Sequence, residues 1–355
     1  MEFGILGLAG AGKTTIFSLL TGAEVPFGTG KSHVGIAKVP DRRLDLLSEL
    51  FKPRKHTPAT VKFVDVPPVT KGGAATLNLP ELRTMDGLAL VLRGFTNPQV
   101  PHPEGQLNPQ RDLELIETEL LLSDLTVASG RLERLAKELP KHRTPELERE
   151  KQVLERCLAF LEEGRPLREL ALTPEEERVL KGFTFLTRKP LLLILNADEA
   201  EASNLPQALA RWGLQELESR PNVAVTAVCA SLEEEISRLA AEDQEAFLKE
   251  LGLPDRALSR LLEKAYALLG QISFFTVGED ECRAWSIPQG TTAVKAAGVI
   301  HSDFERGFIR AEVVRWDELL ACGSLAVCRS KALLRQEGKD YVVQDGDVIT
   351  FKFNV

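Results

Sequence analysis

A glycine-rich stretch near the start of the chain has the residue types and spacing that bind a chain of phosphates. Residues 7–14, Gly-Leu-Ala-Gly-Ala-Gly-Lys-Thr, match GxxxxGK[ST], with strand-like EFGIL before them and helix-like KTTIFSLLT after. Glycines let backbone N–H groups turn inward on phosphates, and the start of the following helix adds partial positive charge. We expect Lys13 to neutralise the outer phosphates and Thr14 to place its hydroxyl on Mg²⁺. The expected phosphate contacts are Gly10, Ala11, Gly12, Lys13, Thr14 and Thr15.

Two further residues stand where a magnesium site needs them. Asp65 ends the apolar stretch VKFVD. Its carboxylate is therefore expected at the carboxyl edge of a sheet, where it would hold a magnesium-bound water. Thr29, in the stretch PFGTG, is either a second hydroxyl ligand of the metal or an ordinary loop threonine. The expected metal ligands are Thr14, Thr29 and Asp65.

The elements that must position these residues are strands alternating with helices. Apolar runs at 2–6, 61–66, 88–92, 190–196 and 223–228 have the length of buried strands. Such alternation predicts a parallel sheet covered on both faces. In residues 110–189, apolar residues recur at steps of three and four, which predicts two long helices packed as an antiparallel hairpin, with two ordinary covering helices as the alternative. The apolar residues expected to pack between the two helices, called the seam residues, are Leu121, Leu125, Ala128, Leu132, Leu135 and Leu139 on the first helix and Leu147, Leu154, Leu158 and Leu161 on the second.

The pattern changes again from residue 271 onward. Five strand-like stretches, SFFTV, RAWSI, FIRAEVV, DYVV and VITFKF, surround the helix-like TTAVKAAGVI. We expect a small mixed domain of strands around one helix.

Composition narrows the class of protein. The net charge of −8 argues against a uniformly basic nucleic-acid binder. No apolar run reaches the roughly 18 residues that a membrane helix needs, and no basic segment precedes EFGIL. We expect a cytoplasmic protein that is not bound to a membrane.

Taken in order, these motifs resemble the Obg-like ATPase (YchF) family of P-loop NTPases. PFGT, VPDRRLDLL, FVDV, LNPQRDLELIETELLLSDL and NADE are similar to family signatures, and the C-terminal RAWSIPQGTTAVKAAGVIHSDFERGFIRAEVV and EGKDYVVQDGDVITFKFNV look like its TGS domain. The resemblance covers essentially the whole chain. It implies an α/β fold: a Ras-like, Obg-type P-loop domain with an inserted helical coiled-coil hairpin and a C-terminal β-grasp (ubiquitin-like) TGS domain. We expect the nucleotide-binding domain at 1–109 and 190–270, the insert at 110–189 and the TGS domain at 271–353.

The stretch NADE stands where such folds read the base. GTPases use Asn-Lys-x-Asp, whose aspartate accepts two hydrogen bonds from guanine. Here Ala197 replaces the lysine and Glu199 the aspartate, and the longer carboxylate is expected to crowd guanine. The family's NxxE pattern goes with ATP preference, which the resemblance carries over to Asn196, Ala197 and Glu199, with Asp198 as the alternative register. VCASLEE matches a further base-contacting loop of the family, which implies Ala230, Ser231 and Leu232.

The residues after Asp65 depart from the family pattern Asp-x-Ala-Gly, whose glycine N–H senses the γ-phosphate. Here Pro67 and Pro68 follow Val66, and proline has no N–H to donate. Losing one such donor costs about 3–4 kcal/mol of transition-state stabilisation, so we expect binding to persist and hydrolysis to be slow. His102, in VPHPEG, aligns with a family loop histidine and is, with Lys13, the candidate catalytic residue; its alternative is a solvated loop histidine.

Three function classes remain open at this point. The first is a slow, Mg²⁺-dependent ATPase that prefers ATP to GTP and acts with the ribosome in translation or stress regulation. The second is a module that senses ATP or ADP with negligible hydrolysis, and the third is a GTPase. The hairpin tip, residues 131–143, holds five Lys or Arg against two Glu, which suits RNA phosphates or is an ordinary solvated helix face. The family's association with ribosomes implies the ribosome or ribosomal RNA as a partner, and we expect a monomer.

Overall fold

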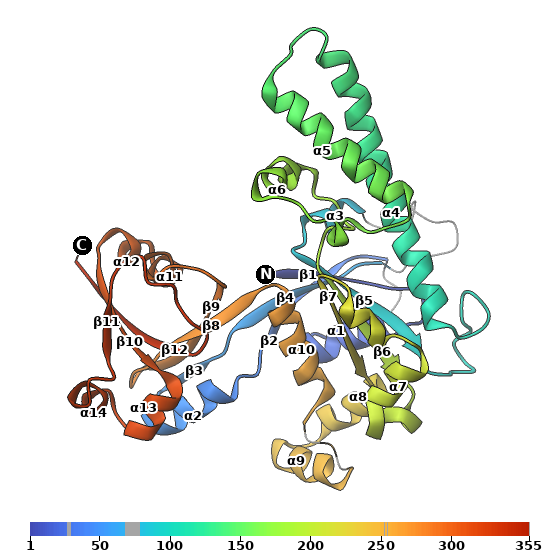
Figure 1. Ribbon diagram of the computed structural model, residues 1–355. Helices are drawn as coiled ribbons and strands as arrows, with labels where there is room; N and C mark the ends of the chain where they lie inside the picture. Colours follow the sequence, from blue (N-terminus) through green and yellow to red (C-terminus); the bar gives the residue numbers. More distant parts are fainter. Residues whose placement is uncertain (27–29, 68–78, 252, 254, 355) are drawn as a thin grey trace. The chain divides into compact units, whose positions relative to one another are not determined.

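The computed structural model shows an α/β chain that divides into two compact units. The first consists of residues 1–36 and 62–264, and the second of residues 37–61 and 265–355. Residues 37–61, which the sequence analysis assigned to the nucleotide-binding domain, therefore pack with the C-terminal part of the chain. Figure 1 shows that each unit is built on its own sheet. The residues that the structure describes are 1–26, 30–67, 79–251, 253 and 255–354.

The first unit is built on a six-stranded sheet with the order β2-β4-β1-β5-β6-β7. The five strands from β4 to β7 run parallel. The predicted strands are confirmed, and β2 is one that the sequence analysis did not anticipate. The strands are β1 (Glu2–Leu6), β2 (His33–Lys38), β4 (Thr60–Asp65), β5 (Gly87–Gly94), β6 (Leu191–Ala197) and β7 (Val223–Val228).

Helices cover this sheet on both sides. In Figure 1, α1 lies on one side of the sheet, and α3 and the inner part of α4 lie on the other. Strands covered on both faces bury every side chain, as β5 and β6 do. The helices that accompany these strands are α1 (Lys13–Thr21), α3 (Leu79–Thr84), α7 (Leu205–Arg211), α8 (Ala230–Arg238), α9 (Ala241–Glu250) and α10 (Ala257–Leu268). Short 3₁₀ turns are η2 (Leu167–Glu169), η3 (Lys181–Phe183), η4 (Glu199–Asn204) and η5 (Gln215–Ser219).

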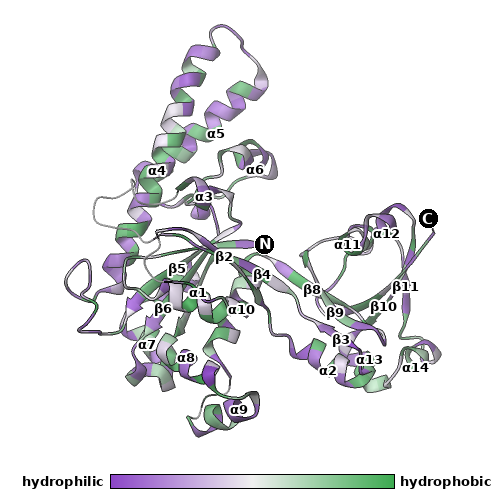
Figure 2. Cartoon of the chain, turned by 180° about the vertical axis from the view of Figure 1, so that it is seen from behind, coloured by the Kyte–Doolittle hydropathy of each residue, from purple (hydrophilic) through white to green (hydrophobic). Residues whose placement is uncertain are grey.

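The predicted helical hairpin is present between β5 and β6. It consists of α4 (Pro109–Glu138) and α5 (Pro145–Glu162), followed by the short α6 (Pro174–Leu180). Asn108 and Thr144 cap the two long helices through their side chains, each with proline in the first turn. All ten predicted seam residues lie in or against one apolar cluster. The outer end of the hairpin is drawn mainly in the hydrophilic colour in Figure 2.

The second unit is built on a mixed sheet with the order β11-β10-β12-β8-β9-β3. Helix α11 packs its alanines Ala293, Ala296 and Ala297 on the sheet residues Phe274 and Val313, all fully buried. The strands are β3 (Lys55–Thr57), β8 (Gln271–Thr276), β9 (Glu281–Pro288), β10 (Phe308–Arg315), β11 (Arg335–Glu337) and β12 (Asp347–Phe353). The helices are α2 (Arg42–Phe51), α11 (Ala293–Ile300), α12 (Ser302–Arg306), α13 (Trp316–Cys322) and α14 (Leu325–Ser330).

Two sequence expectations for this unit are wrong. DYVV is not a strand, since only Val342 forms a single bridge, to Thr292. Asp347 accepts hydrogen bonds from the Tyr341 hydroxyl and the Gln344 N–H, which closes the segment into a turn instead. The described residues 271–354 also contain three helices besides α11, namely α12, α13 and α14, because short capped segments lack the long periodicity by which a helix is recognised. Within the described part of the chain, no helix has an apolar stretch of membrane-spanning length.

Candidate functional site

The phosphate loop, residues 7–14, joins β1 to α1 at the carboxyl edge of the first sheet. Gly12 is the N-cap of α1 with φ 90°, and Gly10 has φ 74°, both in the left-handed region that favours glycine. A Cβ at Gly12 would stand 2.3 Å from Nδ2 of Asn196. The glycine spacing of the motif is therefore required both by the backbone and by close neighbours.

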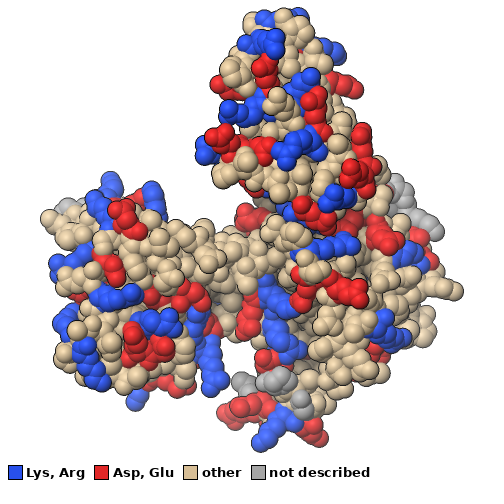
Figure 3. Space-filling view, viewed as in Figure 1, with Lys and Arg blue, Asp and Glu red and all other residues tan. Residues whose placement is uncertain are grey.

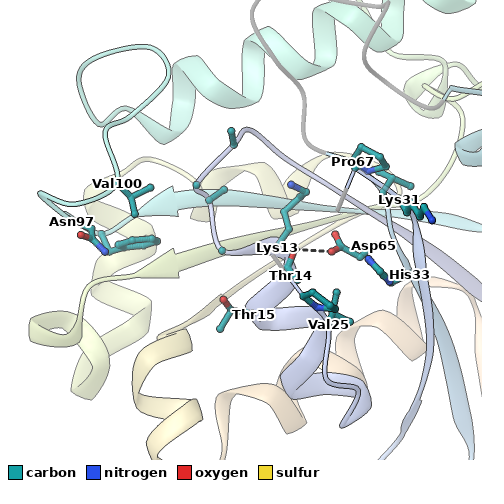
Figure 4. Close-up of a pocket in the computed structure, with 18 residues that line it drawn as sticks. Lys13, Thr14, Thr15, Val25, Lys31, His33, Asp65, Pro67, Asn97 and Val100 are labelled. Carbon is teal, nitrogen blue, oxygen red and sulfur yellow. Dashed lines mark hydrogen bonds between the residues drawn. The ribbon is translucent and has the colours of Figure 1, made fainter. Parts of the chain in front are cut away.

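Lys13 reaches into a cavity from the first turn of α1 (Figure 4). The residue is only 6% exposed. Burial lowers the pKa of Lys13 to about 8, although the nearby Asp65 carboxylate opposes the shift. A desolvated ammonium of this kind gains strongly when an anion such as a phosphate enters the cavity.

Thr14 and Asp65 meet across the same cavity. The Thr14 hydroxyl donates a hydrogen bond of 2.8 Å to Oδ2 of Asp65, whose Oδ1 is buried without a hydrogen-bond partner among the described residues. Burial raises the pKa of Asp65, while the Thr14 hydrogen bond and the charges of Lys13 and His33 oppose this. An orphaned carboxylate oxygen beside a hydroxyl fits the oxygen ligands and water shell that Mg²⁺ prefers. The third expected ligand, Thr29, lies outside the described residues.

The first cavity has a volume of about 490 Å³. In Figure 4, Lys31, His33 and Pro67 line one side, and Asn97 and Val100 line the other. The expected contacts Gly10 to Thr15 all line it. Lys31 and His33 escaped the sequence analysis because no spacing motif marks them.

A second cavity of about 390 Å³ adjoins the first and shares Gly12, Thr15, Phe95 and Asn97 with it. The predicted residues that line it are Asn196, Ala197, Glu199, Ala230 and Ser231. Leu232 lies instead on a smaller, third cavity of about 170 Å³, together with Glu199. Two adjoining cavities of this combined size are typical of a small-molecule binding site. Phe95 follows the end of β5, a position at the carboxyl edge that could have marked it.

Asn196 lines the second cavity and is hydrogen-bonded to the phosphate loop. Its Nδ2 donates a 3.1 Å hydrogen bond to the carbonyl of Ala11, and its Oδ1 accepts one of 3.1 Å from the N–H of Ala230. The side chain is buried at the end of β6. It therefore ties the phosphate loop to the start of α8.

The acidic neighbours Asp198 and Glu199 have different surroundings. Oδ2 of Asp198 accepts from the N–H and hydroxyl of Thr96, at 3.2 and 3.3 Å, and Oδ1 accepts from the N–H of Ala200. These hydrogen bonds, led by that from the Thr96 backbone, lower the pKa of Asp198. Both residues line the second cavity, and Glu199 also lines the third. The Asp198 carboxylate already accepts three hydrogen bonds at this cavity, so Glu199 stays the predicted base-side residue and Asp198 the alternative.

His102 is not solvated, so that expectation is wrong; its side chain is 5% exposed. Nε2 lies 2.9 Å from Oδ2 of Asp112 on α4, and Nδ1 accepts from the N–H of Glu104. Both ring nitrogens are thus engaged, and His102 does not line the first cavity as described. Hydrogen bonds of catalytic groups often rearrange when substrate binds, so a catalytic role for His102 stays a prediction.

Comparisons with known proteins agree with this architecture. The ribosome-binding ATPase YchF of Bacillus subtilis is 39% identical over 362 residues, covering 99% of both chains. The protein of the same name from Escherichia coli O157:H7 is 38% identical with the same coverage. The solved structure of the Schizosaccharomyces pombe YchF GTPase superposes with a TM-score of 0.86 at 29% identity, over 99% of this chain and 97% of that one.

The C-terminal unit has a match of its own. The family model YchF-GTPase_C, described as a protein of unknown function (DUF933), matches residues 271–354. The resemblance inferred from the sequence is therefore confirmed from two directions, by relatives that span the chain and by a model of its last segment. This chain belongs to the YchF family of P-loop NTPases.

Proposed function

We propose that the protein binds ATP with Mg²⁺ and hydrolyses it slowly. The observation that carries the proposal is the convergence of Lys13, Thr14 and Asp65 on one cavity beside the phosphate loop. Lys13 holds the outer phosphates, Thr14 and Asp65 hold the hydrated metal, and loop N–H groups orient the phosphate chain. Bound Mg²⁺ supplies neutralisation of the charge on the phosphates.

ATP is the preferred nucleotide in this proposal. Asp198 and Glu199 both line the second cavity, but the shorter Asp198 is already hydrogen-bonded to Thr96 and Ala200. To bind guanine, the site needs a carboxylate that is free to accept hydrogen bonds from two guanine N–H donors. When such a carboxylate is misplaced, these donors stay unpaired and guanine binds weakly. The replacement of the usual aspartate by Glu199 therefore favours an ATPase over the GTPase alternative.

Slow hydrolysis is expected because the segment after Asp65 lacks the N–H donor that would contact the γ-phosphate. Pro67, two residues after Asp65 at the end of β4, lines the first cavity, and Pro68, which lies outside the described residues, has no N–H. His102 is occupied by Asp112 and Glu104. These same observations favour the second candidate, a nucleotide-sensing module with negligible hydrolysis, over a fast enzyme.

The ribosome or its RNA is the proposed partner, because relatives 38–39% identical are named ribosome-binding ATPases. At the hairpin tip, Arg131 pairs with Glu138 and Glu150, and Arg143 pairs with Glu148. Three exposed basic residues form no ion pair within the described chain and suit RNA phosphates: Arg134, Lys137 and Lys141. In Figure 3, basic side chains lie at this outer end with acidic side chains beside them. We propose further that the protein acts as a monomer in the cytoplasm.

Titration with ATP, ADP and GTP, followed by single-turnover hydrolysis with and without ribosomes, tests the proposal. We expect ATP and ADP to bind tightly and Lys13→Ala to abolish binding. Lys189→Ala removes a half-buried lysine outside the two cavities and is the control, expected to bind normally. GTP binding about tenfold tighter than ATP binding would contradict the base preference.

Co-sedimentation tests the partner. Charge reversal of Arg134, Lys137 and Lys141 together is expected to release the protein from ribosomes. The same reversal of Arg178, Lys181 and Lys249, three exposed basic residues elsewhere in the first unit, is the control and should leave binding intact. Equal loss in both variants would reject the hairpin tip as the contact.

A further inference from the structure

Arg93, at the end of β5, is buried beside the nucleotide cavities and makes hydrogen bonds to the loop that follows it. The residue is 4% exposed. Its Nε donates to the Phe95 carbonyl at 3.1 Å, and its Nη2 donates to the carbonyls of Val100 at 2.9 Å and Asn97 at 3.5 Å. One guanidinium thus holds three carbonyls of residues 95–100, which we name the shared wall.

The opposite side of the same guanidinium faces the phosphate loop. Nη1 of Arg93 is buried without a hydrogen-bond partner in the described part of the molecule. A Cβ built on Gly10 would lie 3.3 Å from this nitrogen and 3.0 Å from Cγ1 of Val100. Burial lowers the pKa of Arg93, and the Asp112 carboxylate opposes the shift. The desolvated guanidinium of Arg93 therefore lies between the shared wall and the phosphate loop.

The shared wall forms part of both cavities. Phe95 and Asn97 line the first cavity and the second. The Arg93 guanidinium lies over the Phe95 ring at 4.7 Å, and Asp198 accepts a hydrogen bond from the N–H of Thr96 in the same wall. A planar guanidinium can satisfy carbonyls in several directions and cover an aromatic face at once, which an ammonium cannot. The position of Phe95 and Asn97 therefore depends on Arg93.

We propose that Arg93 is a positioning residue that sets the affinity for adenine nucleotides by fixing the shared wall against the phosphate loop. This inference rests on the proposed function. Arg93 lines neither cavity and acts through Phe95 and Asn97. The shared wall also lines the second cavity, beyond the phosphate loop. Its displacement therefore weakens the binding of ATP in the ground state and in the transition state equally. KM for ATP therefore rises while kcat stays unchanged.

The test compares Arg93→Lys with Arg168→Lys. Arg168 is also 4% exposed, has an unpartnered Nη2, bonds the Lys189 carbonyl and Glu117, and lines neither cavity. Both variants are expected to lower the unfolding temperature by similar amounts. Only Arg93→Lys is expected to weaken ADP and ATP binding, by about tenfold, through loss of charge-assisted hydrogen bonds. Arg93→Gln keeps a planar group with two donors and serves for the same comparison if the lysine variant does not fold.

A double-mutant cycle with Phe95→Ala shows whether Arg93 acts through the shared wall. We expect the effect of Arg93→Lys on ADP affinity to shrink to about threefold or less when Phe95 is already alanine. A full effect in that background, an equal loss of affinity in Arg168→Lys, or wild-type affinity in Arg93→Lys overturns the inference while the proposed function stands. A wild-type protein that binds no adenine nucleotide overturns both.

Discussion

Thr14 donates a hydrogen bond of 2.8 Å to Asp65, and that bond joins the start of α1 to the end of β4 across the first cavity. The second oxygen of Asp65 is buried and unpartnered among the described residues. A half-satisfied buried carboxylate next to a hydroxyl and the desolvated Lys13 is costly in an empty cavity and favourable once a hydrated cation and phosphates enter. The site is thus built to gain stability from its ligand.

The pKa of Lys13 predicts how nucleotide binding depends on pH. Burial lowers it from 10.5 to about 8 in the free protein, whereas bound phosphates favour the charged amine. In Mg²⁺-free buffer, ADP affinity is therefore expected to be constant below pH 8 and to fall above it by up to about tenfold per pH unit. Calorimetric titration between pH 7 and pH 9.5 measures this, with Lys189→Ala as a control that keeps the slope. A flat profile would contradict a role for Lys13 as the phosphate cation.

The free energy of unfolding is expected to rise with pH, whereas the ADP affinity falls. Between about pH 8 and pH 10.5 the unfolded chain holds the Lys13 proton and the folded chain does not. The contribution of Lys13 to stability therefore rises with pH over this window and is lost as the pH falls through 8. Denaturant unfolding of the nucleotide-free protein at both ends of the window checks the sign.

Replacing Pro68 by glycine is expected to speed hydrolysis. Glycine restores an N–H where the family pattern has one, and a single preorganised donor contributes about a hundredfold or more to the rate. Single-turnover hydrolysis of ATP measures the change. Pro67→Ala, which leaves Pro68 in place, is the control and should stay slow. An unchanged rate in Pro68→Gly would refute the missing-donor explanation.

Shortening Glu199 to aspartate is expected to move the base preference toward GTP. The shorter carboxylate leaves room for guanine and accepts from its two donors, so the ratio of GTP to ATP affinity should rise by about tenfold or more. Asp198→Asn is the control, because Asp198 is bonded to Thr96 and Ala200; it should alter both affinities together. A ratio that moves equally in both variants would argue against Glu199 as the base-side residue.

Arg43 is expected to stabilise the second unit without affecting nucleotide binding. It pairs with Asp41 and Asp345 and lies 5.3 Å above the ring of Phe275, and hydrogen bonds to the two carboxylates raise its pKa despite burial. Arg43→Ala should lower the free energy of unfolding by about 2 kcal/mol. Arg42→Ala, its exposed neighbour, should change it by less than about 0.5 kcal/mol. Equal effects would show that the pairs with Asp41 and Asp345 contribute nothing.

The elements that the sequence predicted are those whose pattern is local. KTTIFSLLT and VAVTAV coincide with the bounds of α1 and β7, since a helix after a glycine loop and a strand buried on both faces each carry a distinct signature. β2 is an edge strand with Val34 and Ile36 exposed. β3 has three residues, and its partner β9 lies more than two hundred positions away. No local pattern specifies such pairings.

The candidate site divides in the same way. Lys13 and Thr14 share a motif with fixed spacing, and Asp65 and Asn196 end apolar strands, so their meeting follows from the parallel sheet. Arg93 and His33 belong to no motif of fixed spacing that the sequence analysis could recognise. Arg93 matters because the fold buries it between two loops, and His33 because a strand end brings it to the cavity. The sequence alone does not contain these distances.

The most direct test of the account is a crystal structure of the protein with Mg²⁺ and a non-hydrolysable ATP analogue. We predict density for the phosphates along residues 7–14, with Lys13 Nζ in hydrogen-bond contact with the outer phosphates, Mg²⁺ on the Thr14 hydroxyl, and adenine in the cavity that Glu199 lines. A structure from the same crystals with both cavities empty, or with the nucleotide bound elsewhere on the chain, would contradict it.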